Sequence, residues 1–170
     1  MQTAWGWNRK NPPPGQHWMP SRTRKEFGQR IWNEFFKFTF VRNPWDRLVS
    51  FYCYWDLRDV FEPGTNFEDF VLDIVKRNKH EAGKRHCPSC IKCLQDPECF
   101  DFIGRFENLK EDYEYVCDQI GAEKCTLPHI HKSKRTHYSH YYDDELKEIV
   151  ARKYCDDIEY FGYEFESEPL

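Results

Sequence analysis

Apolar residues recur at helical spacing along much of the chain. The clearest case follows Pro44, where one helix face carries Leu48, Phe51, Tyr52 and Trp55. Asn43 suits the N-cap of this helix, because its side chain accepts a hydrogen bond from the first turn, and Pro44 suits the first helical position. We expect further helices over 21–36, with an interruption at Gly28, and over 66–77, 109–120 and 143–160.

Two short runs of aromatic and β-branched residues predict buried strands, at 37–41 and 100–105. Each run is followed by a predicted helix, so the order of elements indicates an α/β fold with more helix than strand. The 170 residues predict a single domain. Within it, we expect residues 1–20, rich in Pro, Gly and Trp, to be irregular. The polar, cysteine-rich residues 78–99 are expected to form an exposed insertion.

Composition narrows the class of protein. Aromatic residues make up 18% of the chain, which provides enough apolar surface to argue against disorder. The formal charge of −4 argues against a nucleic-acid partner. No apolar run approaches the roughly 18 residues of a membrane span, and residues 1–15 lack the apolar core of a signal peptide. We therefore expect a cytoplasmic protein without a transmembrane segment.

The eight cysteines fall into two groups. Four are scattered through amphipathic segments and are expected to be buried small hydrophobes: Cys53, Cys117, Cys125 and Cys155. Four thiols that suit tetrahedral zinc lie close together, at Cys87, Cys90, Cys93 and Cys99. This spacing differs from two separated Cys-x2-Cys pairs and from an iron–sulfur run. An insertion with reduced or surface-paired thiols therefore stays open beside a structural zinc site.

Residues 40–50 carry the sharpest candidate chemistry. Arg42 lies between a predicted strand and a helix N-terminus, where free N–H groups and the helix dipole favour an anion. A guanidinium offers a planar fork of donors and Ser50 a hydroxyl, so the two suit one phosphate group. Helical spacing also puts Asn43, Arg47 and Ser50 on one face. The alternative is an Arg42 paired with a carboxylate such as Asp46, and a Ser50 that faces solvent.

The run Val-Arg-Asn-Pro-Trp-Asp-Arg-Leu-Val-Ser at 41–50 resembles the 3′-phosphate-binding motif of the carbohydrate-type sulfotransferases. Similar segments follow in the family's order at 102–109, 127–133 and 157–163. The resemblance implies a P-loop-NTPase-like sulfotransferase fold and the donor 3′-phosphoadenosine-5′-phosphosulfate (PAPS), which leaves as adenosine 3′,5′-bisphosphate (PAP). It also implies that Arg42 and Ser50 hold the donor's 3′-phosphate, and that the acceptor is a hydroxyl group, most simply on a carbohydrate.

The same resemblance implies further donor contacts. Arg105 and Glu107 match a segment that lies beside the nucleotide in the family. A loop that folds over the donor's phosphates matches Lys132, Ser133 and Lys134. As alternatives, Arg105 and Glu107 form a salt bridge between strand and helix, and the basic loop is simply solvated.

His17 is the candidate for the acceptor side. It lies where relatives often carry a histidine near the acceptor, and an imidazole suits a base that takes a proton from a hydroxyl. The alternative is an exposed loop histidine without a role.

The family's loop with Gly and Lys, which cradles the 5′-phosphosulfate, has no match in the sequence. We therefore expect an N-terminally truncated parallel sheet, which a second copy or a partner chain would complete. Two other functions stay open: a non-catalytic relative that binds PAP or a partner chain, and a small zinc-binding interaction module. A P-loop kinase is excluded, because Gly-x4-Gly-Lys-Ser/Thr is absent. Since animal members of the family are anchored in the Golgi membrane, a Golgi location is the alternative to the cytoplasm.

Overall fold

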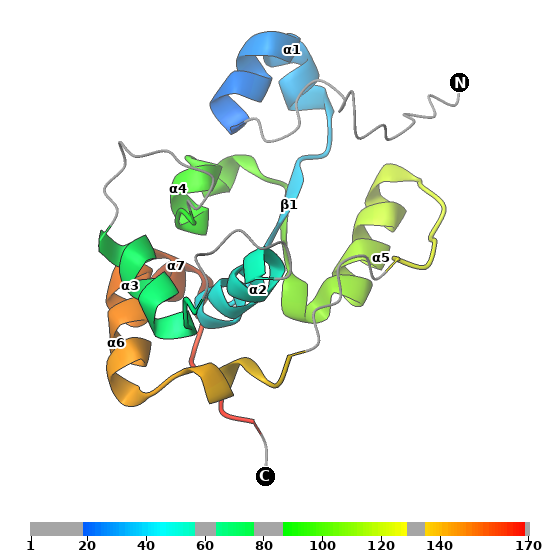
Figure 1. Cartoon of the computed structure of the whole chain (residues 1–170). Coiled ribbons are helices and arrows are strands. Elements are labelled where there is room, and N and C mark those ends of the chain that lie inside the picture. The colour runs from blue at the N-terminus through cyan, green and yellow to red at the C-terminus, as the bar shows by residue number, and fades with distance from the viewer. Residues whose placement is uncertain (1–18, 57–63, 77–86, 129–134, 169–170) are drawn as a thin grey trace.

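The computed structural model describes residues 19–56, 64–76, 87–128 and 135–168. In chain order, its helices and strands are α1 (Pro20–Glu34), β1 (Phe38–Val41), α2 (Pro44–Asp56), α3 (Phe67–Lys76), α4 (Cys90–Leu94), β2 (Phe102–Arg105), α5 (Leu109–Ile120), α6 (Asp144–Lys153) and α7 (Cys155–Phe161) (Figure 1). Short 3-10 turns lie at Pro97–Cys99, Phe106–Asn108 and Tyr138–Tyr141. The predicted helix-rich α/β class is confirmed. Within these ranges, no helix has both the length and the apolar character that a membrane crossing requires.

The two strands form a small parallel sheet. Phe38 pairs with Phe102 at one end and Val41 with Arg105 at the other, so the carboxyl ends of both strands lie side by side. Gly104 lies opposite Phe40, and a Cβ atom at this position would come within 2.6 Å of the Phe40 ring. The lack of a side chain at Gly104 therefore lets the aromatic ring lie over the sheet. The P-loop-like strand order stays a prediction.

The main hydrophobic core lies where α2, α3 and α6 pack together with the 3-10 turn at Tyr138–Tyr141. Its buried side chains come from five segments of the chain: Trp45, Leu48, Val49, Phe67, Phe70, Val71, Ile74, Cys87, Tyr138, Leu146, Val150 and Tyr154. A smaller core contains Val41 of the sheet with Leu94, Phe161 and Tyr163. The main core fixes α2 against α3 and α6, and the smaller core fixes the end of β1, so the two together position the turn that carries the candidate site.

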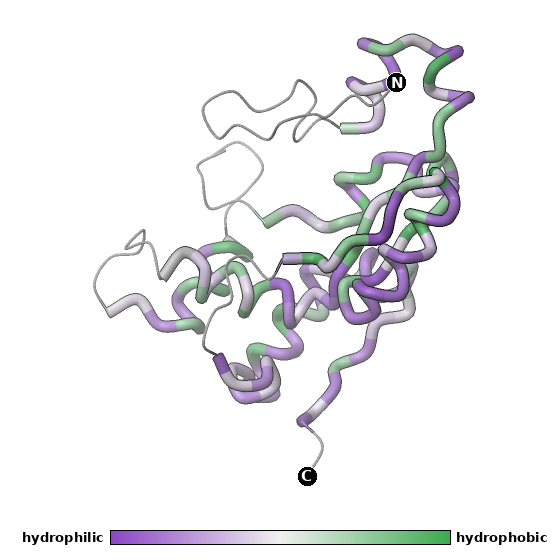
Figure 2. The backbone as a smooth tube through the Cα atoms, turned by 90° about the vertical axis from the view of Figure 1, so that its right-hand side faces the viewer, coloured by the Kyte–Doolittle hydropathy of each residue, from purple (hydrophilic) through white to green (hydrophobic). Residues whose placement is uncertain are grey.

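α1 lies at the edge of the molecule, beyond β1, in both views (Figures 1 and 2). It buries none of its residues, and the Ser21 N–H donates a hydrogen bond of 3.0 Å to the Gln95 side chain. The interruption expected at Gly28 is confirmed. Its φ of 83° is a conformation that residues with a side chain rarely adopt, and it kinks the helix there.

The single helix expected over 143–160 is wrong, because the chain divides into α6 and α7 at Tyr154. Tyr154 has φ −112° and ψ 25°, and its side chain is fully buried. Its hydroxyl donates a hydrogen bond of 2.8 Å to the Cys87 carbonyl. Neither Gly nor Pro marks this break, which depends on a tertiary contact. The change of direction brings Asp157, on α7, to the start of α4.

The exposure expected for the cysteine-rich segment is wrong in part over 87–99, where Lys92, Gln95, Asp96 and Glu98 are exposed, and residues 78–86 of that segment lie outside the described residues. Cys87, Ser89 and Leu94 are buried. The Asp157 carboxylate, only 1% exposed, accepts hydrogen bonds from the backbone N–H groups that begin α4, at 2.7 and 2.8 Å. The segment from Cys87 onward is therefore part of the packed fold.

Candidate anion site at the start of α2

The turn between β1 and α2 is fixed by Asn43, which is 4% exposed. Its side-chain oxygen accepts a hydrogen bond of 3.1 Å from the Trp45 N–H, as expected of an N-cap residue. Its side-chain amide donates to the Glu164 carbonyl at 2.9 Å. Its backbone N–H donates to the Glu107 carboxylate at 2.7 Å. Three separate segments of the chain therefore hold the residue that follows Arg42.

Arg42 contacts both Ser50 and Asp46, the two partners that the sequence suggested for it. Its Nη1 donates a hydrogen bond of 3.0 Å to the Ser50 hydroxyl, while its Nε and Nη2 lie 2.7 and 2.6 Å from Asp46 Oδ2. The guanidinium carbon lies 4.0 Å from the centre of the Phe106 ring. Arg42 and Ser50, predicted as one site, are thus brought together, and Ser50 contacts Arg42 in addition to its partial exposure to solvent.

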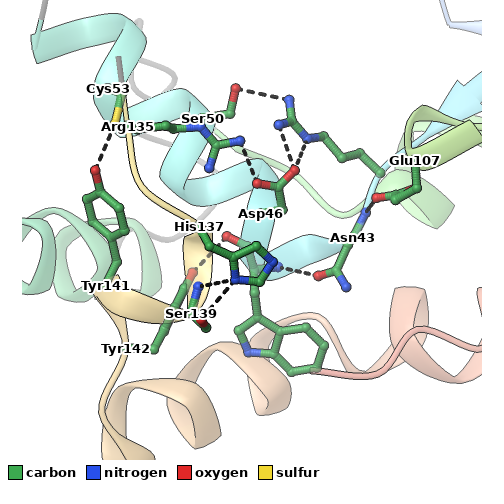
Figure 3. A network of polar contacts seen from close by, with 12 residues as sticks. Asn43, Asp46, Ser50, Cys53, Glu107, Arg135, His137, Ser139, Tyr141 and Tyr142 are labelled. Carbon is green, nitrogen blue, oxygen red and sulfur yellow. Dashed lines mark hydrogen bonds and ion pairs between the residues drawn. The ribbon is translucent and has the colours of Figure 1, made fainter. Parts of the chain in front are cut away.

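A second guanidinium reaches the same carboxylate. Arg135 Nη2 lies 2.6 Å from Asp46 Oδ1, so Arg42 and Arg135 each contact a different oxygen of Asp46. Figure 3 shows Asp46, Ser50 and Arg135 close together beside α2. We call Arg42, Asp46, Ser50 and Arg135 the arginine cluster. No pattern in the sequence indicates the contact between Asp46 and Arg135, which are 89 positions apart.

The electrostatics of the arginine cluster are unbalanced. Two guanidinium groups and one carboxylate leave one net positive charge, because arginine stays protonated in proteins. Burial lowers the pKa of the Arg42 guanidinium, and the nearby Arg135 lowers it further, while Asp46 opposes both effects. The cluster therefore has the charge of an anion-binding site.

Two of the backbone N–H groups that we expected to favour an anion at this helix N-terminus are already bonded within the protein. The backbone N–H of Asn43 is bonded to Glu107, and that of Trp45 is bonded to the Asn43 side chain. These two groups are occupied within the protein, and Pro44 has no N–H to offer. The donors that remain at this turn are on the side chains of Arg42, Ser50 and Arg135.

The placement of Arg47 on the same face as Ser50 is also wrong. Arg47 points into the interior, where its Nη1 lies 2.6 Å from Cys90 Sγ and its Nη2 lies 3.4 Å from Asp157 Oδ2. Its guanidinium also lies over the ring of Tyr154, at 5.0 Å. Arg47 therefore joins α2 to α4 and α7 and is not available to a ligand.

Arg105 and Glu107 lie next to the arginine cluster, and the described contacts do not pair them with each other. Arg105 donates a hydrogen bond to the Phe161 carbonyl, and its guanidinium lies 4.9 Å from the ring of Tyr163. Glu107 accepts from the Tyr163 hydroxyl at 3.4 Å as well as from Asn43. The proposed salt bridge between them is therefore not formed, and a contact with the nucleotide stays a prediction for both.

Four of the predicted site residues lie outside the described residues: His17, Lys132, Ser133 and Lys134. Their roles stay predictions.

The structure does not gather the four clustered cysteines into a metal site. Cys87, Cys90, Cys93 and Cys99 are all free thiols. No group of three or more Cys, His, Asp or Glu in the described ranges is arranged to hold a metal ion. Burial raises the pKa of Cys90 to about 11, although Arg47 opposes the shift. The arrangement of the described thiols therefore gives a structural zinc site no support.

The four scattered cysteines differ in their exposure to solvent. Cys117 is buried and Cys53 half-buried, as expected, but Cys125 and Cys155 are exposed, so the expectation is wrong for that pair. Cys155 begins α7, beyond the break that the sequence did not predict.

Comparison with known proteins decides the family. A model described as the sulfotransferase family matches residues 7–164, nearly the whole chain. The chain belongs to the sulfotransferase family. Among curated proteins, carbohydrate sulfotransferase 9 of Homo sapiens is 27% identical over 161 residues, and carbohydrate sulfotransferase 14 of Danio rerio 26% over 166. An uncharacterized protein of Archaeoglobus fulgidus is 33% identical over 100 residues.

This sulfotransferase-family chain matches different shares of the three relatives' lengths. The alignments cover 74% and 76% of this chain but only 33% and 44% of the human and zebrafish proteins. With the archaeal protein they cover 58% of this chain and 78% of the relative. The chain thus spans less than half the length of the carbohydrate sulfotransferases it matches. No solved structure matches it.

Proposed function

We propose that this chain binds PAPS and transfers its sulfuryl group to a hydroxyl of a carbohydrate-like acceptor, with Arg42 and Ser50 as the 3′-phosphate site. The observation that carries the proposal is the 3.0 Å contact between Arg42 Nη1 and Ser50 Oγ within a cluster of net positive charge. A guanidinium fork next to a hydroxyl suits the oxygens of one terminal phosphate. Family membership supports sulfuryl transfer as the reaction.

The remaining roles follow from the family's motifs. Arg105 and Glu107 border the nucleotide, and Lys132, Ser133 and Lys134 contact its phosphates. In the transfer, the bond between sulfur and the 5′-phosphate oxygen breaks and a bond from sulfur to the acceptor oxygen forms. PAP leaves, and His17 takes the acceptor's proton as general base. The cytoplasmic location stays a prediction that the described residues do not test.

Calorimetry with PAP tests the donor site. We expect wild-type protein to bind PAP and to discriminate against ADP, which lacks a 3′-phosphate. Arg42→Ala and Ser50→Ala should each weaken PAP binding by about 10- to 100-fold, since a hydrogen bond to a charged group contributes about 1.5–3 kcal/mol. Arg30→Ala is the matched control, because Arg30 is 78% exposed on α1.

Sulfuryl transfer is then measured with radiolabelled PAPS and a panel of glycans, beside His17→Ala. Transfer that His17→Ala reduces supports the whole proposal. PAP binding that depends on Arg42 without transfer to any glycan would favour the non-catalytic alternative. A folded protein that binds PAP and ADP equally well would contradict the 3′-phosphate site itself.

A further inference from the structure

Arg42 and Arg135 approach each other only because one carboxylate joins them. Guanidinium groups repel, yet Asp46 holds both within 2.6 Å of its two oxygens. The three side chains are each 17% exposed, so water screens them only in part. The arrangement places two partly buried cations around one directly bonded anion, with the Glu107 carboxylate acting on Arg42 from farther away.

Arg42 and Asp46 are both restrained by further contacts. Arg42 is fixed by Asp46, by the Ser50 hydroxyl and by the face of the Phe106 ring. Asp46 is in the first turn of α2, whose start is locked by buried Asn43. Preorganised donors of this kind bind a charged group without first losing side-chain freedom.

The Arg42–Ser50 contact and the Arg135–Asp46 contact both lie beside α2, where Figure 3 shows Asp46, Ser50 and Arg135 close together. A guanidinium has five N–H donors, and among the described residues the Asp46 contact uses one nitrogen of Arg135, so the other nitrogens can serve a second acceptor. A terminal phosphate monoester carries nearly two negative charges and three acceptor oxygens. It therefore suits two guanidinium groups and a hydroxyl better than a monoanion or a neutral hydroxyl does.

We propose that Arg135 is a second phosphate-binding guanidinium at this site and that Asp46 is a positioning residue that orients both arginines toward a terminal phosphate. The inference rests on the proposed function, because the phosphate in question is the 3′-phosphate of PAPS or PAP. Asp46 stays in place when the phosphate binds. Arg135 then determines how strongly the site selects a ligand with a 3′-phosphate over one without it.

The test measures selectivity for the 3′-phosphate, defined as the Kd of adenosine 5′-monophosphate (AMP) divided by the Kd of PAP. Calorimetry on the full chain compares wild type with Arg135→Ala, Arg135→Lys, Asp46→Asn and Arg42→Ala, and with Arg30→Ala as control. Melting curves establish that each variant is folded. Arg135→Gln, which keeps most of the side chain, replaces Arg135→Ala if the latter does not fold.

Selectivity should fall about 10- to 100-fold in Arg135→Ala, while the Kd of AMP stays unchanged. Arg135→Lys should recover part of the loss through its charge, and Arg30→Ala should match wild type. Asp46→Asn should lower selectivity as well, because both arginines lose their orientation. A purely structural role for these residues would weaken PAP and AMP binding equally.

Two results would overturn the inference while the proposed function stands. One is selectivity that collapses in Arg42→Ala but stays within twofold of wild type in Arg135→Ala. The other is higher selectivity in Asp46→Asn, which would make Asp46 a competitor of the phosphate and not its positioning residue. Wild-type protein without any selectivity for PAP over AMP would instead overturn the proposed function, and this inference with it.

Discussion

Arg42 and Arg47 lie five positions apart at the start of α2, and each contacts an aspartate, but the balance of charge around them differs. Arg42 shares Asp46 with Arg135 and also reaches the partly exposed Ser50 hydroxyl. Arg47 contacts Asp157, which is 1% exposed and accepts two backbone N–H groups of α4 as well. The Arg42 and Arg47 side chains are about equally exposed, at 17% and 18%, but the carboxylate beside Arg42 is shared with a second cation, whereas the carboxylate beside Arg47 is almost fully buried.

The pKa values of the two guanidinium groups are shifted in opposite directions. Burial lowers the pKa of Arg42, and Asp46 does not fully offset it while Arg135 is nearby. Burial would also lower the pKa of Arg47, but Cys87, Cys90, Tyr154 and Asp157 together outweigh it and raise the pKa. The charge of Arg47 is matched by the buried Asp157 carboxylate. In the arginine cluster one directly bonded carboxylate serves two guanidinium groups, so the cluster is the better candidate for an external anion.

The largest expected effect comes from removing Asp157, the buried partner of Arg47. Asp157→Ala leaves the Arg47 charge uncompensated and removes the acceptor at the start of α4. We expect the free energy of unfolding, measured with urea, to fall by about 3–5 kcal/mol. Asp156→Ala is the matched control, because the neighbouring Asp156 is exposed and pairs with exposed Lys92, and it should cost less than about 1 kcal/mol. Equal effects of the two variants would show that the Arg47 region is not the enclosed one.

Alkylation of cysteines tests how closed that region is. Iodoacetamide reacts with thiolates, and burial raises the pKa of Cys90 to about 11 despite the opposing effect of Arg47. At pH 8, the thiolate fraction of Cys90 is then on the order of 100-fold below that of a thiol with the ordinary pKa of about 8.5. Peptide mass spectrometry should find Cys90 labelled at least about 100-fold more slowly than exposed Cys155, at a rate that rises about tenfold per pH unit up to pH 10.

Labelling of Cys90 as fast as Cys155 would contradict this. It would mean that Arg47, 2.6 Å from the sulfur, holds a thiolate open to reagents. The region would then be reactive and accessible, and its contrast with the arginine cluster would fail.

Sequence reasoning succeeded where the determinants are local. The strand before Arg42, the cap at Asn43, the bounds of α5 at Leu109 and Ile120 and the meeting of Arg42 with Ser50 all follow from residues within about one helical turn or one motif. It failed for Arg47, because a helical wheel shows which residues share a face but not which face the rest of the chain covers.

The other failures have the same cause. The partner of Arg47 sits on α7, and α7 reaches it only because buried Tyr154 ends α6 without a Gly or Pro. Likewise, Arg135 meets Asp46 across 89 positions, and no local pattern records that contact. Charge pairs that join distant segments depend on tertiary packing, so the composition of the arginine cluster could be found only in the folded chain.

The smallest expected effect concerns Phe106. Its substitution tests how much the aromatic contact with Arg42 adds to the charged contacts of the arginine cluster. Phe106 is 42% exposed and its ring centre lies 4.0 Å from the Arg42 guanidinium carbon. A cation–π contact at an exposed site contributes about 0.5–1 kcal/mol. Phe106→Leu should therefore weaken PAP binding about two- to fivefold in calorimetry, with little change in the free energy of unfolding. Phe35→Leu, at a 65% exposed position after α1, should leave PAP binding unchanged. If Phe106→Leu binds PAP as tightly as wild type, Asp46 and Ser50 alone are sufficient to orient Arg42. The orientation of Arg42 would then depend on its polar and charged contacts, without a measurable contribution from the aromatic ring.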